Sequence, residues 1–351
     1  MGKLTRRELE AYVGDYSQVL GIRECTLQGG KAKGIKAYEI KNGQGLEFTV
    51  LGDKNMNIPY MTFKGLNMGF VNKTGVCAPE YYQEDGTKGF LRNFEAGFLS
   101  TCGLTYMGTP GEEDGRKLGL HGPISNTPME FSCGKMAWDG DTAWMSVTGE
   151  SREASLFDEY LVLNREFKVS SGENKLIIND RVENRGFSEE PLMILYHFNF
   201  GYPLMSGQTK IYSNMTEIKA RDAYSEKFID QCGVFDEPSV GREEEVFFRT
   251  KGEQDIQWAK AVIHNEALGV AVAIGFDPEQ LPVLNQWKSQ RCGDYALGIE
   301  PGTSHVGGRI RARKEGMLMT IKAGEVKDFH IEIEFLDDAE QIQMAIKKTE
   351  I

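Results

Sequence analysis

The stretch Tyr160-Leu161-Val162-Leu163-Asn164-Arg165-Glu166-Phe167-Lys168-Val169 alternates between two kinds of side chain, and this alternation decides the fold class. In an extended chain every second side chain lies on the same face. One face would carry Leu161, Leu163, Arg165 and Phe167, and the other Val162, Asn164, Glu166 and Lys168. Ser171-Gly172 then gives a turn signal, and Lys175–Val182 would return as the paired strand. The stretch therefore predicts a hairpin of an antiparallel sheet.

Strand signals of this kind recur along most of the chain. Ile35–Ile40 and Leu46–Leu51 flank the turn signal Asn42-Gly43, and a second hairpin is expected from Met317–Lys322 and Lys327–Phe335. Further strand candidates are Ala143–Val147, Leu192–Phe198, Ile256–His264, Val270–Gly275 and Tyr295–Glu300. Many short strands with glycine turns predict an all-β protein, a large antiparallel two-sheet β-sandwich with short helices at the termini.

The whole chain, residues 1–351, is expected to form a single domain. Its expected parts are an N-terminal helical arm, the β-sandwich and a C-terminal helix, at residues 1–30, 31–336 and 337–351. Thr5 and Glu8 form a capping-box pattern in the arm. No linker rich in proline, glycine or serine divides the chain. The charged region Ala220–Glu245 is expected to be an insertion or a lid over a site.

Composition and charge exclude several classes of function. The 351 residues carry 40 Lys and Arg against 52 Asp and Glu, a formal net charge of -12, whereas binding to nucleic-acid phosphates needs clustered basic side chains. No apolar run approaches the roughly 18 residues of a membrane span, and the first residues lack the apolar core of a signal peptide. We therefore expect a cytoplasmic protein without nucleic-acid or membrane partners, and a homo-oligomer stays open.

The six cysteines show no spacing typical of a metal or redox site. They are Cys25, Cys77, Cys102, Cys133, Cys232 and Cys292, and no two of them form a CxxC pair. A chain of this length does not need disulfides to stabilise a core. We expect free thiols, no metal and no cofactor.

Three polar residues stand out in apolar or glycine-rich surroundings. His121 lies in Gly119-Leu120-His121-Gly122-Pro123, where the glycines let the backbone approach a ligand closely. His197 and Asn199 occupy alternate positions of an apolar strand, hence one face. Glu300 ends another apolar strand before a Pro-Gly turn. A structural role would explain each residue alone, but together they are expected to converge on one open cleft.

Two histidines and a glutamate suit acid–base chemistry on a sugar. Opening a cyclic hemiacetal needs a base that takes the anomeric hydroxyl proton and an acid that protonates the ring oxygen. An imidazole titrates near neutrality, and the pKa of a glutamate is tuned by its surroundings. The three residues are therefore candidates for opening and reclosing a sugar ring.

Short motifs along the chain match those of a known family in their order and spacing, and the match spans roughly residues 45–335. They are Phe90-Leu91-Arg92-Asn93-Phe94 with Thr101-Cys102-Gly103-Leu104, then Leu120-His121-Gly122, Asp180-Arg181-Val182-Glu183-Asn184, Tyr196-His197-Phe198-Asn199, Asn285-Gln286-Trp287-Lys288 and Gly298-Ile299-Glu300-Pro301-Gly302-Thr303. With these motifs the chain resembles the aldose 1-epimerase, or galactose mutarotase-like, superfamily, and more narrowly an uncharacterised branch of it.

The resemblance implies roles for four residues. In that superfamily the glutamate of the last motif is the general base, which corresponds to Glu300. The histidine of the strand motif is the general acid at the ring oxygen, which corresponds to His197, and the histidine of the Leu-His-Gly motif binds the sugar near that oxygen, which corresponds to His121. An upstream arginine contacts sugar hydroxyls, and Arg92 is the candidate. The superfamily's sugar-binding aspartate has no counterpart among these motifs.

Three further residues complete the expected binding set. Asn199 is expected to support the site through hydrogen bonds. Trp287 is expected either to stack on a sugar face or to pack in the core. Lys288 is expected either to meet a negative substituent, such as a phosphate, or to be a surface charge.

The leading functional interpretation is a cofactor-free, aldose 1-epimerase-like enzyme that interconverts the anomers of a sugar or a close derivative. A non-catalytic carbohydrate-binding or sensor protein on the same scaffold is an alternative, because a fold does not determine a function. An isomerase of a sugar phosphate is another, with Lys288 and Arg291 holding the anion.

Overall fold

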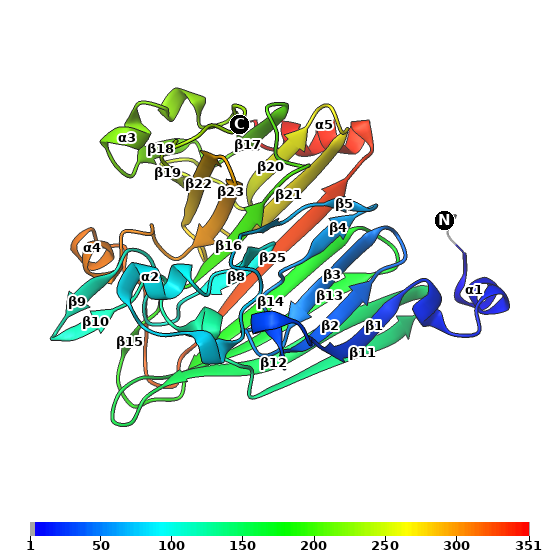
Figure 1. Ribbon diagram of the computed structural model, residues 1–351, viewed down its shortest axis with the longest axis horizontal. Helices are drawn as coiled ribbons and strands as arrows, with labels where there is room; N and C mark the ends of the chain where they lie inside the picture. Colours follow the sequence, from blue (N-terminus) through cyan, green and yellow to red (C-terminus); the bar gives the residue numbers. More distant parts are fainter. Residues whose placement is uncertain (1–3, 351) are drawn as a thin grey trace.

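A large antiparallel sheet of eight strands forms one layer of the molecule (Figure 1). The computed structural model describes residues 4–350. The strands run in the order β11-β12-β13-β14-β25-β21-β20-β17. Their bounds are β11 Phe131–Asp139, β12 Thr142–Ala154, β13 Tyr160–Ser170, β14 Lys175–Asn184, β17 Thr209–Ser213, β20 Ala259–Asn265, β21 Val270–Phe276 and β25 Val326–Leu336.

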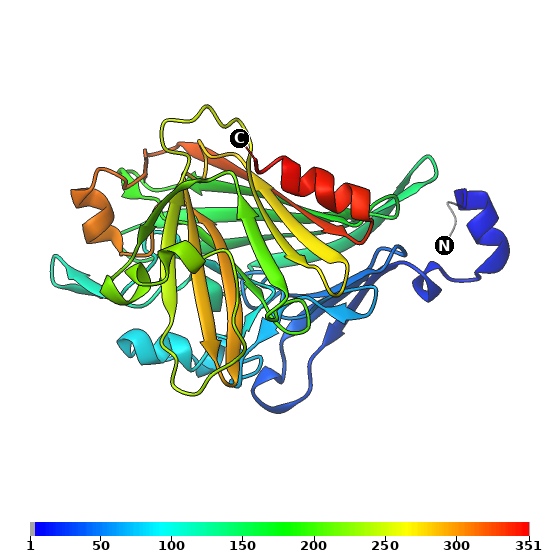
Figure 2. The same cartoon turned by 90° about the horizontal axis from the view of Figure 1, so that it is seen from above.

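Two further antiparallel sheets pack against this layer (Figure 2). The six-stranded sheet has the order β18-β19-β22-β23-β16-β8 and the five-stranded sheet the order β1-β2-β3-β4-β5. The bounds of the first are β8 Leu99–Cys102, β16 Leu195–Phe200, β18 Glu217–Ala220, β19 Glu245–Thr250, β22 Val283–Arg291 and β23 Asp294–Gly302. Those of the second are β1 Gly21–Thr26, β2 Lys36–Lys41, β3 Leu46–Leu51, β4 Met61–Phe63 and β5 Leu66–Asn67.

Short elements connect the sheets and cover their ends. Three two-stranded pairs join β6 Phe70–Val71 with β7 Ala96–Gly97, β9 Gly111–Glu113 with β10 Arg116–Leu118, and β15 Glu190–Pro191 with β24 Thr320–Ile321. The α-helices are α1 Arg6–Tyr12, α2 Gly86–Leu91, α3 Ala223–Glu226, α4 Arg309–Lys314 and α5 Ala339–Lys347. Single 3₁₀ turns lie at Tyr16–Gln18, Gly30–Ala32, Pro79–Tyr81, Ile124–Asn126 and Ile229–Gln231.

One hydrophobic core joins the three large sheets. It combines Phe167 and Ile178 of the eight-stranded sheet with Phe198 and Leu297 of the six-stranded sheet and Phe48 of the five-stranded sheet, all of them buried. Burial of apolar surface between sheet faces is the main stabilising contribution in such a sandwich. The predicted all-β antiparallel sandwich is confirmed.

The hairpin predicted from residues 160–169 is formed by β13 and β14. Its register places Arg165 opposite Asp180, and both side chains are fully buried. Arg165 Nε donates to Asp180 Oδ1 at 2.9 Å, and the Tyr196 hydroxyl donates to Asp180 Oδ2 at 2.6 Å. A buried charge is tolerated when it is paired and hydrogen-bonded. This network explains how an arginine occupies the apolar face of β13.

Three expectations about the elements need correction. Residues 21–26, expected in a helical arm, form the edge strand β1, whose largely exposed side chains lack the alternation that marks a buried strand. The expected hairpin of Met317–Lys322 with Lys327–Phe335 does not form, because β24 pairs with β15. Helices also lie inside the chain, at α2, α3 and α4, and not only near its termini.

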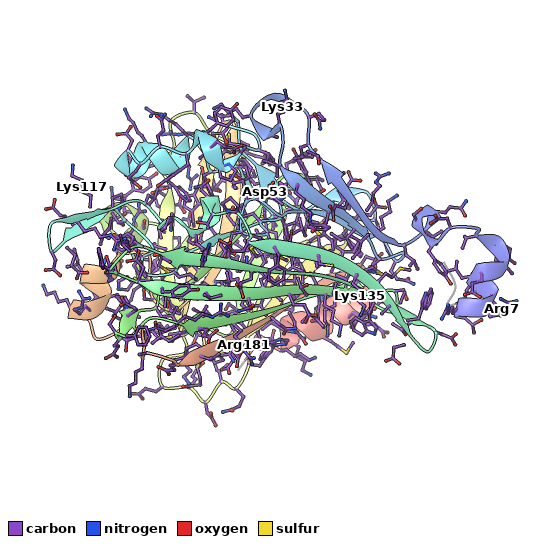
Figure 3. All side chains as sticks on the ribbon, turned by 90° about the horizontal axis from the view of Figure 1, so that it is seen from below. Arg7, Lys33, Asp53, Lys117, Lys135 and Arg181 are labelled. Carbon is purple, nitrogen blue, oxygen red and sulfur yellow. The ribbon has the colours of Figure 1, made fainter. Side chains whose placement is uncertain are left out.

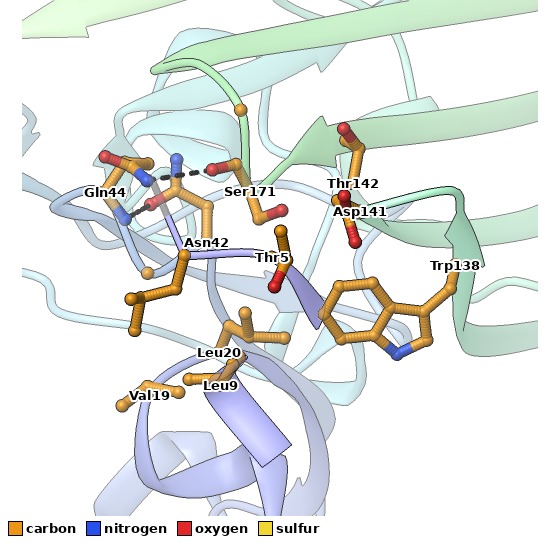
Figure 4. A pocket seen from close by; sticks show the side chains of 13 residues that line it. Thr5, Leu9, Val19, Leu20, Asn42, Gln44, Trp138, Asp141, Thr142 and Ser171 are labelled. Atoms are coloured by element: carbon orange, nitrogen blue, oxygen red, sulfur yellow. Dashed lines mark hydrogen bonds between the residues drawn. The ribbon is translucent and has the colours of Figure 1, made fainter. Parts of the chain in front are cut away.

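The N-terminal helix α1 begins with the expected capping box, because Thr5 accepts from Glu8 N and the Glu8 carboxylate accepts from Thr5 N. A hollow of about 300 Å³ lies between α1 and the ends of nearby strands (Figure 4). Leu9 and Trp138 line it, and Gln44 Nε2 closes one side by donating to Ser171 O at 2.9 Å. Because α1 itself forms one wall of this hollow, we interpret the hollow as the place where the N-terminal arm packs against the strands.

Exposed charged side chains lie on the outer face of the eight-stranded sheet, among them Lys135 on β11 and Arg181 on β14 (Figure 3), and α5 packs on this face over β20 and β21. The C-terminal helix α5 lies where it was expected and is capped by Asp338, whose carboxylate accepts from Gln341 N at 3.0 Å. Within residues 4–350, no helix combines the length and the apolar character that crossing a membrane would require.

Candidate functional site

The central strands β16 and β23 bring His197 and Glu300 together. Their antiparallel register pairs Phe198 with Ile299, so His197 and Glu300 are direct neighbours across the two strands and share a face. His197 Nε2 lies 3.1 Å from Glu300 Oε1. Only 6 % of His197 and 2 % of Glu300 is exposed. The six-stranded sheet therefore holds an imidazole and a carboxyl group in contact inside the protein.

His121 reaches the same place from the loop after β10. Its backbone has a φ of +61°, and Gly122 follows with a φ of +72°. A Cβ at Gly122 would lie 2.3 Å from Tyr106 O, so only glycine fits this close crossing of two backbones. The ring centroids of His121 and His197 are 5.7 Å apart. The expected convergence of the three residues is thus observed, although they lie far apart in the sequence.

His197 and Glu300 lie at the buried end of the cluster, whereas His121 and Trp287 are half-buried, so the site is more enclosed than the open cleft that was expected. The ring centroid of Phe94 lies 5.2 Å from that of His197, and the ring centroid of Phe90 lies 5.1 Å from that of His121. Both phenylalanines come from α2 and the residues that directly follow it. The two rings, four residues apart in the chain, pack against His121 and His197. The segment that carries them therefore covers the polar cluster on the six-stranded sheet.

Burial sets the protonation of the three groups. It raises the pKa of Glu300 well above its usual range, and the negative charge of Glu244 raises it further. It lowers the pKa of His197 to about 3, with a contribution from the charge of His121, and lowers the pKa of His121 to about 4. Burial therefore favours the uncharged form of all three groups.

Four buried polar atoms of the cluster have no hydrogen-bond partner among the described residues. They are His121 Nδ1, His197 Nδ1, Asn199 Oδ1 and Glu300 Oε1. The 3.1 Å contact between His197 and Glu300 is close but lacks the alignment of a hydrogen bond. Buried polar groups are nearly always satisfied in native proteins. Four unsatisfied atoms in one place can be paired by a ligand that is rich in hydroxyl groups.

Asn199 is fixed beside His197 by its own hydrogen bonds. Its Nδ2 donates to His197 O at 2.9 Å and to Ala96 O at 3.3 Å, and the residue is fully buried. This leaves Oδ1 as an unused acceptor. The expected supporting role of Asn199 is compatible with this geometry.

Trp287 forms the edge of the cluster on β22. Its ring centroid lies 6.0 Å from that of His197, and its Nε1 donates to Glu244 Oε2 at 2.9 Å. Arg221 in turn donates to Glu244 Oε1 at 2.8 Å. The sequence motifs did not single out Glu244. Alternation along β19 would place it on the face of Val246, but only the pairing of Val246 with Trp287 shows that this face leads to the site.

Two predicted binding residues lie away from the cluster. Lys288 follows Trp287 on the same strand and therefore faces the opposite side of the sheet. There it is 1 % exposed, and its Nζ lies 3.0 Å from Glu245 Oε2 and donates to Gln231 O at 3.0 Å. Arg92 ends α2 with a side chain that is 62 % exposed and pairs with Asp85. Neither arrangement matches the expected contact with substrate, and the burial of Lys288 also contradicts the alternative of a surface charge.

No group of three or more His, Cys, Asp or Glu side chains among residues 4–350 is arranged to hold a metal ion. An imidazole and a carboxyl group 3.1 Å apart can exchange one proton between them or pass protons to a shared ligand.

Solved structures of known proteins share this architecture. A "putative aldose 1-epimerase" from Klebsiella pneumoniae subsp. pneumoniae MGH 78578 is 25 % identical, with a TM-score of 0.89 over 99 % of this chain and 90 % of that chain. A galactose mutarotase-like protein from Clostridium acetobutylicum is 15 % identical, with a TM-score of 0.65 over 92 % and 100 %. Galactose 1-epimerase from Lactobacillus acidophilus NCFM is 12 % identical, with a TM-score of 0.58 over 90 % and 99 %.

These likenesses define the class of the protein as a galactose mutarotase-like β-sandwich. Within that class, the chain belongs to the family described as "Domain of unknown function (DUF4432)", which matches residues 32–335. A comparison with curated proteins found no match.

Proposed function

We propose that the protein is an aldose 1-epimerase-like enzyme that interconverts the anomers of a sugar. The observation that carries this proposal is the buried contact between His197 and Glu300, whose pKa values are shifted in opposite directions by burial. Titratable groups with strongly shifted pKa values cluster at catalytic sites. The resemblance of the fold to proteins described as aldose 1-epimerases supports the same reaction.

The pair offers both an acid and a base because it holds one transferable proton. The uncharged form, with Glu300 protonated, differs from the carboxylate–imidazolium form only by the transfer of that proton between two atoms that lie 3.1 Å apart. Hydrogen bonds from sugar hydroxyls to the carboxylate would favour the charged form. In that form Glu300 is the base at the anomeric hydroxyl and His197 is the acid at the ring oxygen.

Ring opening then proceeds without any group outside the pair and the sugar. Glu300 takes the proton of the anomeric hydroxyl while the bond between C1 and the ring oxygen breaks and His197 protonates that oxygen. The resulting aldehyde rotates about the bond between C1 and C2. The hydroxyl then attacks the other face of the carbonyl, and both protons return to their first positions.

The neighbouring groups position the sugar. His121 Nδ1 and Asn199 Oδ1 are unused hydrogen-bonding atoms beside the pair. The partly exposed indole of Trp287 offers a flat apolar surface for the C–H face of a sugar ring. Holding the sugar in one orientation lowers the entropic cost of reaching the transition state.

Polarimetry tests the proposal directly. Freshly dissolved α-glucose and α-galactose should mutarotate faster with the protein than in buffer alone. Glu300→Gln keeps the size of the side chain but cannot accept a proton, so the catalysed rate should fall about 10²-fold or more. Glu266→Gln, which changes an exposed carboxylate paired with Lys210, is the matched control and should keep the full rate.

Two outcomes would contradict the proposal. Full activity of Glu300→Gln would exclude Glu300 as the base. Sugar affinity of the wild-type protein without acceleration of any aldose would instead identify a carbohydrate-binding protein, the alternative that the sequence left open.

A further inference from the structure

A hollow of about 620 Å³ adjoins the polar cluster, and Trp287 is part of its wall. Its other walls come from Arg221 and Tyr224 near α3 and from Ser289 and Arg291 at the end of β22. We call it the Trp287 hollow. Its volume falls in the range of about 300–1,000 Å³ that is typical of small-molecule sites.

The Trp287 hollow opens on the same face of the six-stranded sheet as the cluster. Trp287, Ser289 and Arg291 alternate along β22 and therefore share a face. Trp287 pairs with Gly298, two residues before Glu300, so this face also carries Glu300. A ligand could therefore extend from Glu300 past the indole into the hollow without crossing the sheet.

The distance along β22 exceeds the span of one sugar ring. Glu300 pairs with Asn285, which precedes Arg291 by six residues. A strand rises about 3.3 Å per residue, so these positions lie about 20 Å apart. This separation joins backbone positions, and the long side chain of Arg291 spans part of it, so a ligand that contacts both Glu300 and Arg291 has to be longer than one sugar ring.

The charges of the hollow indicate a neutral ligand. Its lining carries three arginines and four carboxylates: Arg221, Arg242, Arg291, Asp222, Glu243, Glu244 and Asp294. Arg221 and Arg242 are already paired with carboxylates. The lining as a whole is slightly negative, which disfavours a phosphate.

Free hydrogen-bonding groups of both signs are nevertheless present. Among the described residues Arg291 forms no ion pair, and only its Nε is used, donating to Arg242 O at 3.2 Å. Glu243 forms no ion pair within the same residues. A guanidinium and a carboxylate together with the rings of Trp287 and Tyr224 are suited to the hydroxyls and C–H faces of an uncharged sugar.

We propose that the Trp287 hollow is a subsite for a second sugar unit, so that the preferred substrate is a neutral reducing disaccharide. This inference rests on the proposed function, because the reducing unit would react at His197 and Glu300. The second unit would lie against Trp287 and Tyr224 and would bind the free groups of Arg291 and Glu243.

The test compares disaccharides with their own reducing monosaccharide. Values of kcat/KM for mutarotation are measured by polarimetry. The substrates are glucose, the 1→4-linked disaccharides maltose and cellobiose, the 1→6-linked disaccharide melibiose, and glucose 6-phosphate. We expect at least one disaccharide to exceed its monosaccharide about tenfold, an effect of a few added contacts. Arg291→Ser and Tyr224→Ala should each lower this ratio towards one.

The matched control is Arg181→Ser, which removes an exposed arginine on the outer face of the eight-stranded sheet (Figure 3). It should leave the ratio unchanged. A ratio of one or less for every disaccharide, a ratio that survives both Arg291→Ser and Tyr224→Ala, or a preference for glucose 6-phosphate would each overturn the proposal.

Calorimetry separates this proposal from the proposed function. If no aldose turns over, the enzyme assignment fails, and the affinities of the same sugars then decide the subsite. Tighter binding of a disaccharide than of its monosaccharide, lost in Arg291→Ser, would support the subsite without catalysis. Equal affinities would reject it.

Discussion

Burial raises the pKa of Glu300 and lowers the pKa of His197, so it favours the uncharged form of both side chains. Removal from water disfavours a charge. It therefore favours the protonated carboxyl group of Glu300 and the unprotonated imidazole of His197. Both shifts arise mainly from burial, and the two groups lie 3.1 Å apart. In the proposed reaction the two groups therefore act together in one step.

The first prediction concerns this coupling. His197→Asn should lower the catalysed mutarotation rate about 10²-fold or more because it removes the acid. The double variant with Glu300→Gln should lose much less than the product of the two single losses, because both groups serve one step. Polarimetry of the three variants measures this. Losses that multiply fully would show that the groups act independently.

The second prediction concerns pH and stability. The pKa of His197 is lowered to about 3 in the folded protein, whereas an unfolded histidine titrates near 6.5. As the pH falls from about 6.5 towards 3, the unfolded chain binds a proton at this residue and the folded chain does not. The free energy of unfolding therefore decreases. His197→Asn should reduce the slope of unfolding free energy against pH by up to about 1.4 kcal/mol per pH unit. Urea unfolding from pH 7 to 4 measures the slope, and identical slopes would contradict the assignment.

At the scale of elements, the segment that covers the site is fixed by a buried ion pair. Lys54 pairs with Glu95 and donates to Asn93 O at 3.0 Å, and both charged side chains are almost completely buried. The same segment carries Phe94, which packs on His197, and Ala96, whose carbonyl oxygen accepts from Asn199. The ion pair thus fixes the position of the segment that covers the site relative to the six-stranded sheet.

The third prediction removes one partner of this pair. Lys54→Met should destabilise the protein by about 3–5 kcal/mol because it leaves Glu95 buried without a counter-charge. The double variant Lys54→Met with Glu95→Leu should recover much of the loss, since both desolvated charges are then gone. Urea unfolding measures both variants. A single variant as stable as the wild-type protein would show that Glu95 is not held by Lys54.

On the scale of the whole molecule, three sheets share one core, and the six cysteines differ in how deeply they are buried. All six cysteines are free. Cys77, Cys102 and Cys232 are buried, whereas Cys133 and Cys292 are exposed. Burial raises the pKa of Cys102 well above its usual range and so keeps its thiol unreactive.

The fourth prediction follows from these depths. Thiol titration of the folded protein without reductant should modify Cys133 and Cys292 rapidly and Cys102 very slowly. In denaturant all six thiols should react, because no disulfide connects them. Mass spectrometry of the labelled peptides identifies each site. Two or fewer thiols in denaturant, or rapid labelling of Cys102 in the native state, would contradict the structure.

Predictability from the sequence depended on how local each signal was. The β13–β14 hairpin, the hairpin of β2 and β3 and the capping box of α1 were all predicted, because each is decided by neighbouring residues. The partner of β24 and the edge strand β1 were not, because their pairing is decided by packing with distant segments. The lysine beside Trp287 could have been excluded by strand alternation alone, since adjacent side chains face opposite sides.

The sequence by itself determined the all-β class, the alternation of each long strand and the identity of the three polar residues in apolar surroundings. These properties can be recognised from neighbouring residues, because side chains alternate with a period of two along an extended chain. Only the tertiary structure decided that His197 touches Glu300, that Phe90 and Phe94 cover them, and that Glu244 stands beside Trp287. Such contacts join strands far apart in the chain, and their pairing is selected by burial of the whole core, which no local pattern records.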